Sequence, residues 1–166
     1  AVASAQALMT PRRHAPKPAV LAGCSAVLLW LAFPPVDRGF LGWIAVAPLF
    51  ALVRSDARAW RVFGASWFGG LVFGGLSMSW VASADVAGAL WMALFMSLWW
   101  PLFLLPARTA VRRLRVPLFV AAPIAWVGLE YLRAHVLSGF PWYYLAHTQW
   151  AYLPVIQMCD ILGAWG

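Results

Sequence analysis

Charged residues are scarce in this sequence. Asp, Glu, Lys and Arg make up 10% of the 166 residues, whereas they make up about 25% of a typical soluble domain. Hydrophobic residues make up 64% of the chain, and the mean hydropathy is +0.79. A soluble protein of this size keeps much of its chain at the surface, and so few charges could not cover it. The composition therefore excludes an ordinary soluble domain and, because apolar residues dominate, a disordered chain. It predicts an all-α integral membrane protein.

Catalytic and metal-binding motifs are also lacking. The two cysteines, Cys24 and Cys159, lie in apolar surroundings and form no CxxC pair, so we expect both to be small buried apolar side chains. His147 has no second ligand at a suitable spacing. The sequence contains no Ser–His–acid set, phosphate-binding loop or HExxH motif. From the residues alone we therefore expect no catalytic residue, no metal and no cofactor.

Long uncharged runs are what the sequence does contain, at 18–36, 39–53, 62–84, 86–107 and 116–129. A membrane-spanning helix needs about 20 residues. The first, third and fourth runs meet this length, and the fifth does so if it continues through Glu130 and Arg133 to Leu137. The run at 39–53 is short, so it is either a span or a re-entrant segment. We favour a span, which gives a polytopic helix bundle of about five spans plus the start of a sixth near the C-terminus.

Positive charge supports this layout. Ten of the twelve basic residues fall into three clusters, one before the first run and two between later runs. With five spans all three clusters lie on one side, as expected for cytoplasmic loops rich in Lys and Arg. We therefore predict a cytoplasmic tail at residues 1–17 and a membrane domain at 18–166. The net charge of +7 is then explained by basic residues that orient the protein in the membrane, and we expect no nucleic-acid partner. The clusters are Arg12, Arg13 and Lys17; Arg54, Arg58 and Arg61; and Arg108, Arg112, Arg113 and Arg115.

Small residues recur at every fourth position in the third run, in two rows. Such spacing lets helix backbones approach closely in lipid. We favour packing within one chain, and hence a monomer, over a homodimer. Prolines inside three of the runs predict kinked helices. The rows are Ser66, Gly70, Gly74 and Gly75, Ser79, Ser83; the prolines are Pro48, Pro101 and Pro123.

Glu130 and Arg133 are the charges that interrupt the fifth run. An acidic and a basic side chain at i,i+3 in a helix can contact each other. An unpaired charge inside the hydrocarbon core of a membrane costs several kcal/mol. The two side chains therefore either line a site for a lipid headgroup or substrate, or form a structural pair that holds this helix to the next loop. Beyond them, the aromatic stretch from Ser138 to Tyr152, which includes Trp142 and Gln149, either borders an acyl-chain entrance or lies in the interfacial belt.

The order of several motifs resembles one family. Together they are similar to the N-terminal membrane region of apolipoprotein N-acyltransferase, and the resemblance extends from Phe33 to the last residue. The most specific part is Glu-x-Leu-Arg followed by Gly-Phe-Pro-Trp. The motifs are Phe33-Pro34-Pro35-Val36-Asp37, Gly42-Trp43 with Ala47-Pro48-Leu49, Phe68–Gly74 with Ser79-Trp80-Val81, Ala122–Trp126, Glu130–Arg133, Gly139–Trp142 and His147-Thr148-Gln149.

The resemblance implies an enzyme of the bacterial cytoplasmic (inner) membrane. Its substrates would be a phospholipid, which donates an acyl chain, and a diacylglyceryl lipoprotein, whose N-terminal cysteine amine accepts it. In that family a cysteine nucleophile, a glutamate base and a lysine belong to a nitrilase-like domain, and no residue of this chain matches them. We therefore expect a piece cut from such an enzyme, inactive alone, in a reading frame that continues past Gly166. Glu130, Arg133, Trp142 and Gln149 would support the lipid-binding region.

A non-catalytic membrane scaffold or small transporter is the alternative function. Transporters usually place polar groups near mid-membrane to bind a solute or an ion. The first four runs contain no charge, which weighs against ion coupling. Solute uptake by reconstituted vesicles that is abolished by Glu130→Ala would favour this alternative.

Overall fold

The computed structural model describes residues 16–165, and in this range every regular element is helical. The order is α2 (Pro18–Ala32), α3 (Gly42–Ala45), α4 (Ala47–Arg54), α5 (Ala59–Met78), α6 (Val86–Arg112), α7 (Leu118–His135), α8 (Leu153–Ile156) and α9 (Cys159–Leu162). Single 3₁₀ turns lie at Gly39–Leu41, Ser79–Ser83, Val136–Ser138, Leu145–Gln149 and Gly163–Trp165. The all-helical prediction is confirmed. Most of the 1–17 tail, including Arg12 and Arg13, lies outside the described residues.

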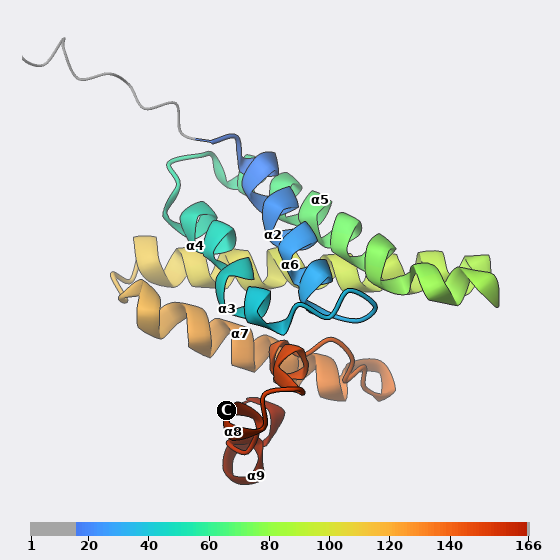
Figure 1. Ribbon diagram of the computed structural model, residues 1–166. Helices are drawn as coiled ribbons and strands as arrows, with labels where there is room; N and C mark the ends of the chain where they lie inside the picture. Colours follow the sequence, from blue (N-terminus) through green and yellow to red (C-terminus); the bar gives the residue numbers. More distant parts are fainter. Residues whose placement is uncertain (1–15, 166) are drawn as a thin grey trace, which may run out of the picture.

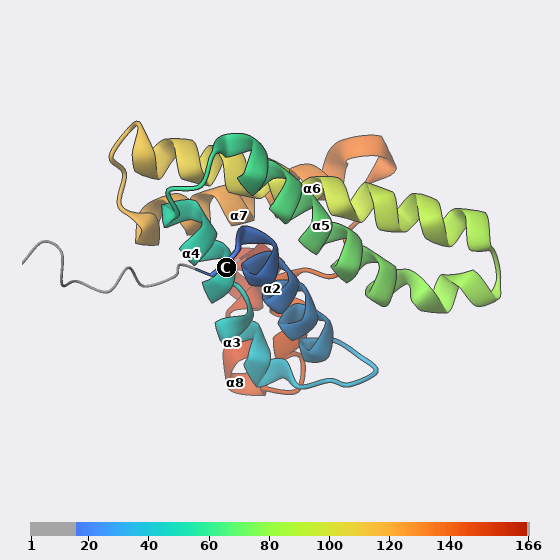
Figure 2. The ribbon, with the colours of Figure 1, turned by 90° about the horizontal axis from the view of Figure 1, so that it is seen from above.

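Helices α5 and α6 form the long antiparallel pair that organises the molecule (Figures 1 and 2). Asp85 begins α6 by accepting hydrogen bonds from the Ala87 and Gly88 backbone nitrogens at 3.0 and 2.9 Å, as an N-cap residue does. Helix α2 packs on α5, α4 packs on α6, and α7 covers another side of α6. The core lies where these helices meet.

Glycines in α5 allow the close approach to α6. A Cβ atom on Gly70 would lie 2.5 Å from the Ser97 carbonyl oxygen, and one on Gly74 would lie 2.7 Å from that of Ala93. The first row of small residues is therefore confirmed as an intramolecular contact. The second row is not, because Gly75 faces open space and the Ser79 and Ser83 hydroxyls are exposed and donate to carbonyls of their own turn.

Two segments are long and apolar enough to cross a membrane, Ala59–Ser83 and Val86–Arg112. Pro18–Ala32, Gly39–Arg54 and Leu153–Trp165 are apolar but shorter. Helix α7 has 18 residues but includes Glu130 and Arg133. Five complete spans are therefore not established by helix length and composition.

The segment at 39–53 is broken, contrary to a single continuous helix. A 3₁₀ turn, α3 and α4 follow one another, with Val46 between the last two. Pro48 lies in the first turn of α4, where proline is tolerated because that N–H has no helical acceptor. Pro48 therefore lies at the break in this segment and not in the interior of a helix, whereas Pro101 and Pro123 do lie inside helices, with Pro106 as a further case.

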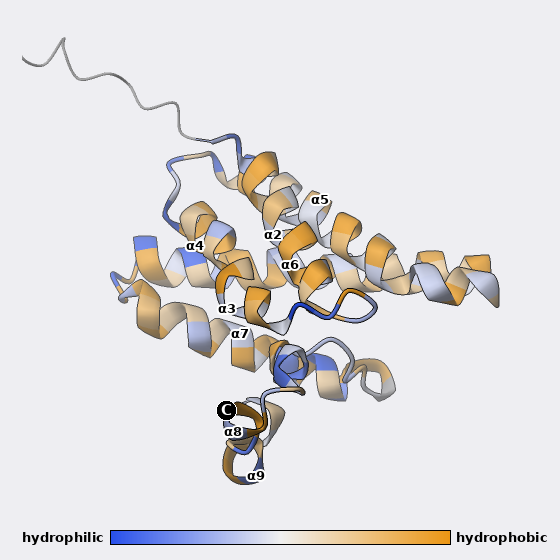
Figure 3. Ribbon diagram, in the orientation of Figure 1, coloured by the Kyte–Doolittle hydropathy of each residue, from blue (hydrophilic) through white to orange (hydrophobic). Residues whose placement is uncertain are grey.

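Hydrophobic residues predominate along the helices (Figure 3), and many large ones are at the surface. Large side chains on several helices are more than half exposed, including Trp43 at 68%, Trp91 at 68% and Phe119 at 80%. Cys24 is exposed and Cys159 is partly exposed, so the prediction that both are buried is wrong. Cys24 lies on the outer face of α2 near exposed Val20 and Val27, because apolar residues here are not confined to the core.

Candidate functional site

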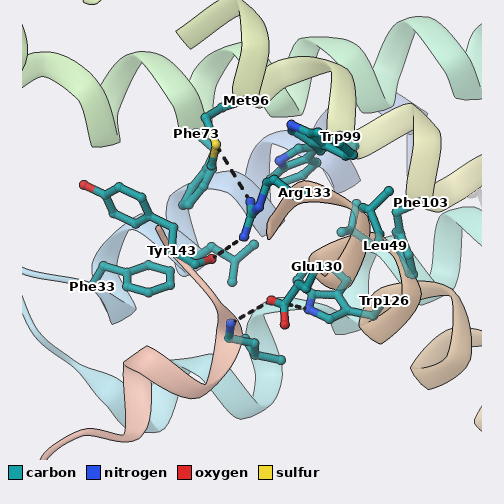
Figure 4. Close-up of a pocket in the computed structure, with 14 residues that line it drawn as sticks. Phe33, Leu49, Phe73, Met96, Trp99, Phe103, Trp126, Glu130, Arg133 and Tyr143 are labelled. Atoms are coloured by element: carbon teal, nitrogen blue, oxygen red, sulfur yellow. Dashed lines mark hydrogen bonds between the residues drawn. The ribbon is translucent and has the colours of Figure 1, made fainter. Parts of the chain in front are cut away.

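Glu130 fastens the second half of α7 to the loop that follows it. The side chain is 5% exposed. Its Oε1 accepts hydrogen bonds from Trp126 Nε1 and from the Leu145 backbone nitrogen, both at 2.9 Å. The carboxylate therefore holds a position on its own helix and a position fifteen residues further along the chain (Figure 4).

Arg133 is buried beside Glu130 but forms no salt bridge with it; in the described part of the chain no carboxylate lies within 4.0 Å of its guanidinium. Nη2 donates to the Tyr143 carbonyl at 3.3 Å, and Nη1 lies 3.8 Å from the Met96 sulfur. The guanidinium lies 5.3 Å from the Tyr144 ring centroid. The i,i+3 spacing thus brings the two side chains near one another without pairing them, because each turns toward a different part of the loop (Figure 4).

A small cavity of about 40 Å³ separates these two charges from the apolar core. Arg133 Nε and Trp99 Nε1 are both buried, and neither has a hydrogen-bond partner among residues 16–165. Both residues line the cavity, which is large enough for a water molecule but not for a lipid headgroup. The remaining lining is mainly aliphatic and aromatic.

A larger apolar cavity, of about 410 Å³, lies along an adjoining face of α7, and Trp126 and Glu130 line both cavities. It separates α7 from α3, α4 and the C-terminal segment. Glu130 and Gln149 are among its few polar lining residues. A concave apolar pocket with a small number of polar groups is the usual form of a site for an apolar ligand. Its other lining residues include Trp43, Val46, Phe50, Pro123, Trp126, Val127, Leu145, Val155, Ile156 and Trp165.

Gln149 is held firmly at the edge of this cavity. Its Nε2 donates to the Gly39 carbonyl at 2.8 Å and to Thr148 Oγ1 at 2.7 Å, and its Oε1 accepts from Trp43 Nε1 at 3.0 Å. Both amide hydrogens and the carbonyl are thus in use. Gln149 ties the 145–149 turn to the start of the 39–54 segment.

Trp142 lies apart from the other predicted residues, in an open hollow of about 660 Å³ lined by Phe33, Trp80, Trp150 and His147 among others. Its ring lies 5.9 Å from that of Trp80 and 5.2 Å from that of Phe140, and the residue is 42% exposed. The structure therefore brings Glu130 and Gln149 to the larger cavity and Glu130 and Arg133 to the small one, and it places Trp142 in a separate hollow.

Tyr143 is the structural residue that sequence reasoning missed. Its hydroxyl donates to the Ser77 carbonyl at 2.8 Å, and its ring packs edge-on against Phe33 and Phe73 at 5.0 and 5.8 Å. Burial raises the pKa of this hydroxyl above its usual value. In the sequence nothing distinguishes Tyr143 from the aromatic residues around it. Its side chain is turned inward by a left-handed backbone (φ +58°), which the residue type does not predict.

Metal binding is not indicated by the described residues. No group of three or more His, Cys, Asp or Glu side chains within 16–165 could hold a metal ion. What the site offers is apolar space with fixed hydrogen-bonding groups at its edges.

Comparison with known proteins gives the relationship. The family model for the apolipoprotein N-acyltransferase N-terminal domain matches residues 25–166. Curated apolipoprotein N-acyltransferases are 37% identical in Geobacter metallireducens, over 89% of this chain and 30% of the relative, and 32% identical in Caulobacter vibrioides, over 91% and 30%. A third, from Rhodopirellula baltica, is 32% identical over 84% of this chain and 27% of its own length. The chain thus spans about 30% of these relatives, and it belongs to the apolipoprotein N-acyltransferase family.

Proposed function

We propose that this chain is the membrane portion of an apolipoprotein N-acyltransferase. The whole enzyme would transfer an acyl chain from a phospholipid to the amine of the N-terminal cysteine of a diacylglyceryl lipoprotein. Family membership over residues 25–166 is the observation on which this rests. The family resemblance assigns the nucleophile, base and lysine to a nitrilase-like domain, so we assign lipid binding to this portion and expect no acyl transfer from the 166 residues alone.

The apolar cavity behind α7 supports a lipid-binding role. Its volume of about 410 Å³ could hold several methylene groups. The hydrogen bonds of Glu130 and Gln149 within the protein would keep its walls in place. Burying an acyl chain there would be favourable by about 0.8 kcal/mol for each methylene removed from water. An acyl donor could therefore be oriented by this portion while the chemistry occurs elsewhere in the enzyme.

Membrane placement is part of the proposal: the bacterial cytoplasmic (inner) membrane, about five spans and the start of a sixth, with a cytoplasmic N-terminus. The broken segment 39–54 supports this count because it connects opposite ends of the bundle. Gly39 accepts from Gln149 at one end, and the Leu52 carbonyl accepts from Arg108 at the other. A re-entrant segment would return to the end where it began.

An acylation assay tests the proposed reaction. The full-length protein from the reading frame that contains this chain would be placed in nanodiscs with phosphatidylethanolamine and a diacylglyceryl lipopeptide. Mass spectrometry should show the lipopeptide gaining one acyl chain. The 166-residue chain should give no product. A full-length protein that leaves the lipopeptide unchanged would contradict the reaction, and product from the short chain would contradict the division of roles.

A matched pair of variants tests the cavity. Val127 lines it and is 37% exposed, so Val127→Trp should fill it without disturbing the core. The acylation rate should fall roughly tenfold, equivalent to about 1.4 kcal/mol of lost binding. Ile124 lies one turn earlier on α7, is 68% exposed and does not line the cavity, so Ile124→Trp is the control. Equal rates in the two variants would remove the cavity from the proposal.

A further inference from the structure

Two loops that are far apart in sequence are fastened together at one end of the bundle. Arg108, near the end of α6, donates from Nη1 to the Leu52 and Ser55 carbonyls at 3.1 and 2.8 Å and from Nη2 to the Ala57 carbonyl at 2.6 Å. Arg112 also donates to the Ser55 carbonyl. The loop between α4 and α5 is therefore held against the end of α6.

This contact gathers a large positive charge. We call five arginines of the two loops the basic face; all are exposed. The only acid within 54–61 and 108–115 is Asp56, which lies 3.1 Å from Arg112. None of the five is within 4.0 Å of a carboxylate in the described part of the chain. The basic face consists of Arg54, Arg58, Arg61, Arg113 and Arg115.

Large apolar side chains are interleaved with these arginines. Trp60 is 65% exposed, Leu114 is 70% exposed and Phe119 is 80% exposed, and the Arg61 guanidinium lies 5.2 Å from the Trp60 ring centroid. Tryptophan with arginine is the combination that lies at headgroup depth in a bilayer. Nucleic-acid bases would stack on the aromatic rings but not on Leu114, and an acidic protein surface would leave all three in water, so the combination favours a lipid surface.

Arg115 adds an observation from the backbone. It has a φ of +59° just after α6, where the Val116 nitrogen donates back to the Ala110 carbonyl at 3.0 Å. Glycine is the residue usually found in this left-handed position after a helix. Here the chain carries an arginine instead, so a positive charge is kept at this place against the local backbone preference.

We propose that the basic face binds the phosphate-bearing headgroups of anionic phospholipids in the leaflet next to these loops. Basic clusters beside membrane helices attract anionic lipid in this way. The proposal rests on the membrane placement proposed above and goes beyond it, because a cluster that only sets orientation needs no preference for one headgroup. The chemistry required is a phosphate with a net negative charge, presented at a bilayer surface.

Native mass spectrometry of lipids retained by the full-length protein tests this. The protein would be released from micelles containing equal amounts of phosphatidylglycerol and phosphatidylcholine. We expect more phosphatidylglycerol to be retained. The triple variant Arg58→Gln, Arg61→Gln, Arg115→Gly should weaken that retention about fivefold for each charge removed. The backbone favours glycine at 115, and an unchanged thermal midpoint would show that the variant folds.

Controls separate the possible outcomes. Arg38→Gln removes an exposed arginine from the loop at the other end and should leave lipid retention unchanged. Equal retention of the two lipids, or an equal effect of Arg38→Gln, would overturn the proposal. Displacement of phosphatidylglycerol by inorganic phosphate at constant ionic strength, or by an oligonucleotide, would overturn the assignment to a lipid surface. Failure of the protein to enter micelles or bilayers would instead contradict the membrane placement.

Discussion

Tyr143 joins three parts of the molecule through one side chain. Its ring contacts Phe33 after α2 and Phe73 on α5, and its hydroxyl donates to the Ser77 carbonyl near the end of α5. Its own carbonyl accepts from Arg133. The loop after α7 is therefore fixed by a residue whose neighbours lie up to 110 positions away.

Tyr143→Phe should show what the hydroxyl contributes. Phe keeps the ring contacts and loses one hydrogen bond, so the unfolding free energy in detergent should fall by about 1 kcal/mol at pH 8. In the wild type, burial raises the pKa of the Tyr143 hydroxyl in the folded protein, so as the pH rises the unfolded chain loses this proton at a lower pH than the folded protein does. Stability should be constant below about pH 10, the ordinary tyrosine value, and fall as the pH rises above it. Thermal midpoints between pH 8 and 11 would measure this.

The difference between the two proteins is the informative quantity. Other groups that titrate at high pH affect the wild type and Tyr143→Phe alike. If the alkaline loss of stability is the same in both, the Tyr143 hydroxyl is not the group responsible.

Glu130 can be tested as a hydrogen-bond acceptor separately from its charge. Glu130→Gln keeps an oxygen for the Trp126 and Leu145 donors, whereas Glu130→Leu leaves both without an acceptor. Unsatisfied buried donors cost about 1–3 kcal/mol each, so we expect Glu130→Leu to lower the unfolding free energy by at least 2 kcal/mol more than Glu130→Gln does. Detergent unfolding titrations would compare them. Equal losses would mean that the negative charge near Arg133 matters more than the acceptor.

Residue types in the sequence were enough to find Glu130 and Arg133 but not their partners. Two charges inside an apolar run are conspicuous, and their burial is what the cost of exposing a charge to lipid predicts for a membrane helix. Their hydrogen bonds go instead to the loop at 143–145. That loop is placed by the backbone of Tyr143 and by Gly139, whose φ is +87°, and neither angle can be derived from residue spacing.

At the scale of elements, α5 and α6 touch through backbone, because glycine removes the side chain between them. Gly70→Ala would place a Cβ atom 2.5 Å from the Ser97 carbonyl oxygen and 2.8 Å from its Cα atom. Since these are backbone atoms, the helices must separate. We expect a loss of about 1–3 kcal/mol, the usual cost of overpacking, measured by unfolding in detergent.

Gly75→Ala is the matched control. It lies on the same helix, and a Cβ atom there meets nothing within 4 Å. Alanine favours a helix over glycine by up to about 1 kcal/mol, so this variant should be neutral or stabilised. If both alanine variants have the same stability, close approach of α5 and α6 does not determine the packing.

Uncharged runs predicted most helices to within a few residues. The run at 86–107 became Val86–Arg112, and the run at 62–84 became Ala59–Met78 with the following turn. Hydropathy predicts the bounds of these two helices because each is a single long apolar segment. The run at 39–53 is apolar as well, but it is broken, and Gly39 and Gly42 beside the break at Leu41 pack against Thr148, a contact more than 100 positions away that composition does not show.

The whole molecule has an apolar perimeter and a basic end. Arg108 and Arg112 fasten the second and third basic clusters together, so these two clusters lie at one end of the bundle, which the predicted layout requires. The first cluster, at Arg12, Arg13 and Lys17, is only partly within the described residues. The side of the membrane on which this end lies therefore requires an experiment on cells.

Cysteine labelling measures that side. In a chain with Cys24→Ala and Cys159→Ala, Ala84→Cys would place a thiol just before α6 and Arg113→Cys just after it; both positions are exposed. Helix α6 has 27 residues, and at 1.5 Å per residue it exceeds a hydrocarbon core of about 30 Å. The two thiols should therefore lie on opposite sides of the membrane.

With the basic end in the cytoplasm, an impermeant maleimide added to intact cells should label Ala84→Cys, and Arg113→Cys should be labelled only after the membrane is opened. Denatured samples labelled in full would show that both thiols are present and reactive. The reverse pattern would place the arginines outside, against the tendency of cytoplasmic loops to carry them. Labelling of both positions in intact cells would mean that α6 does not cross the bilayer, and the proposed layout would fail with it.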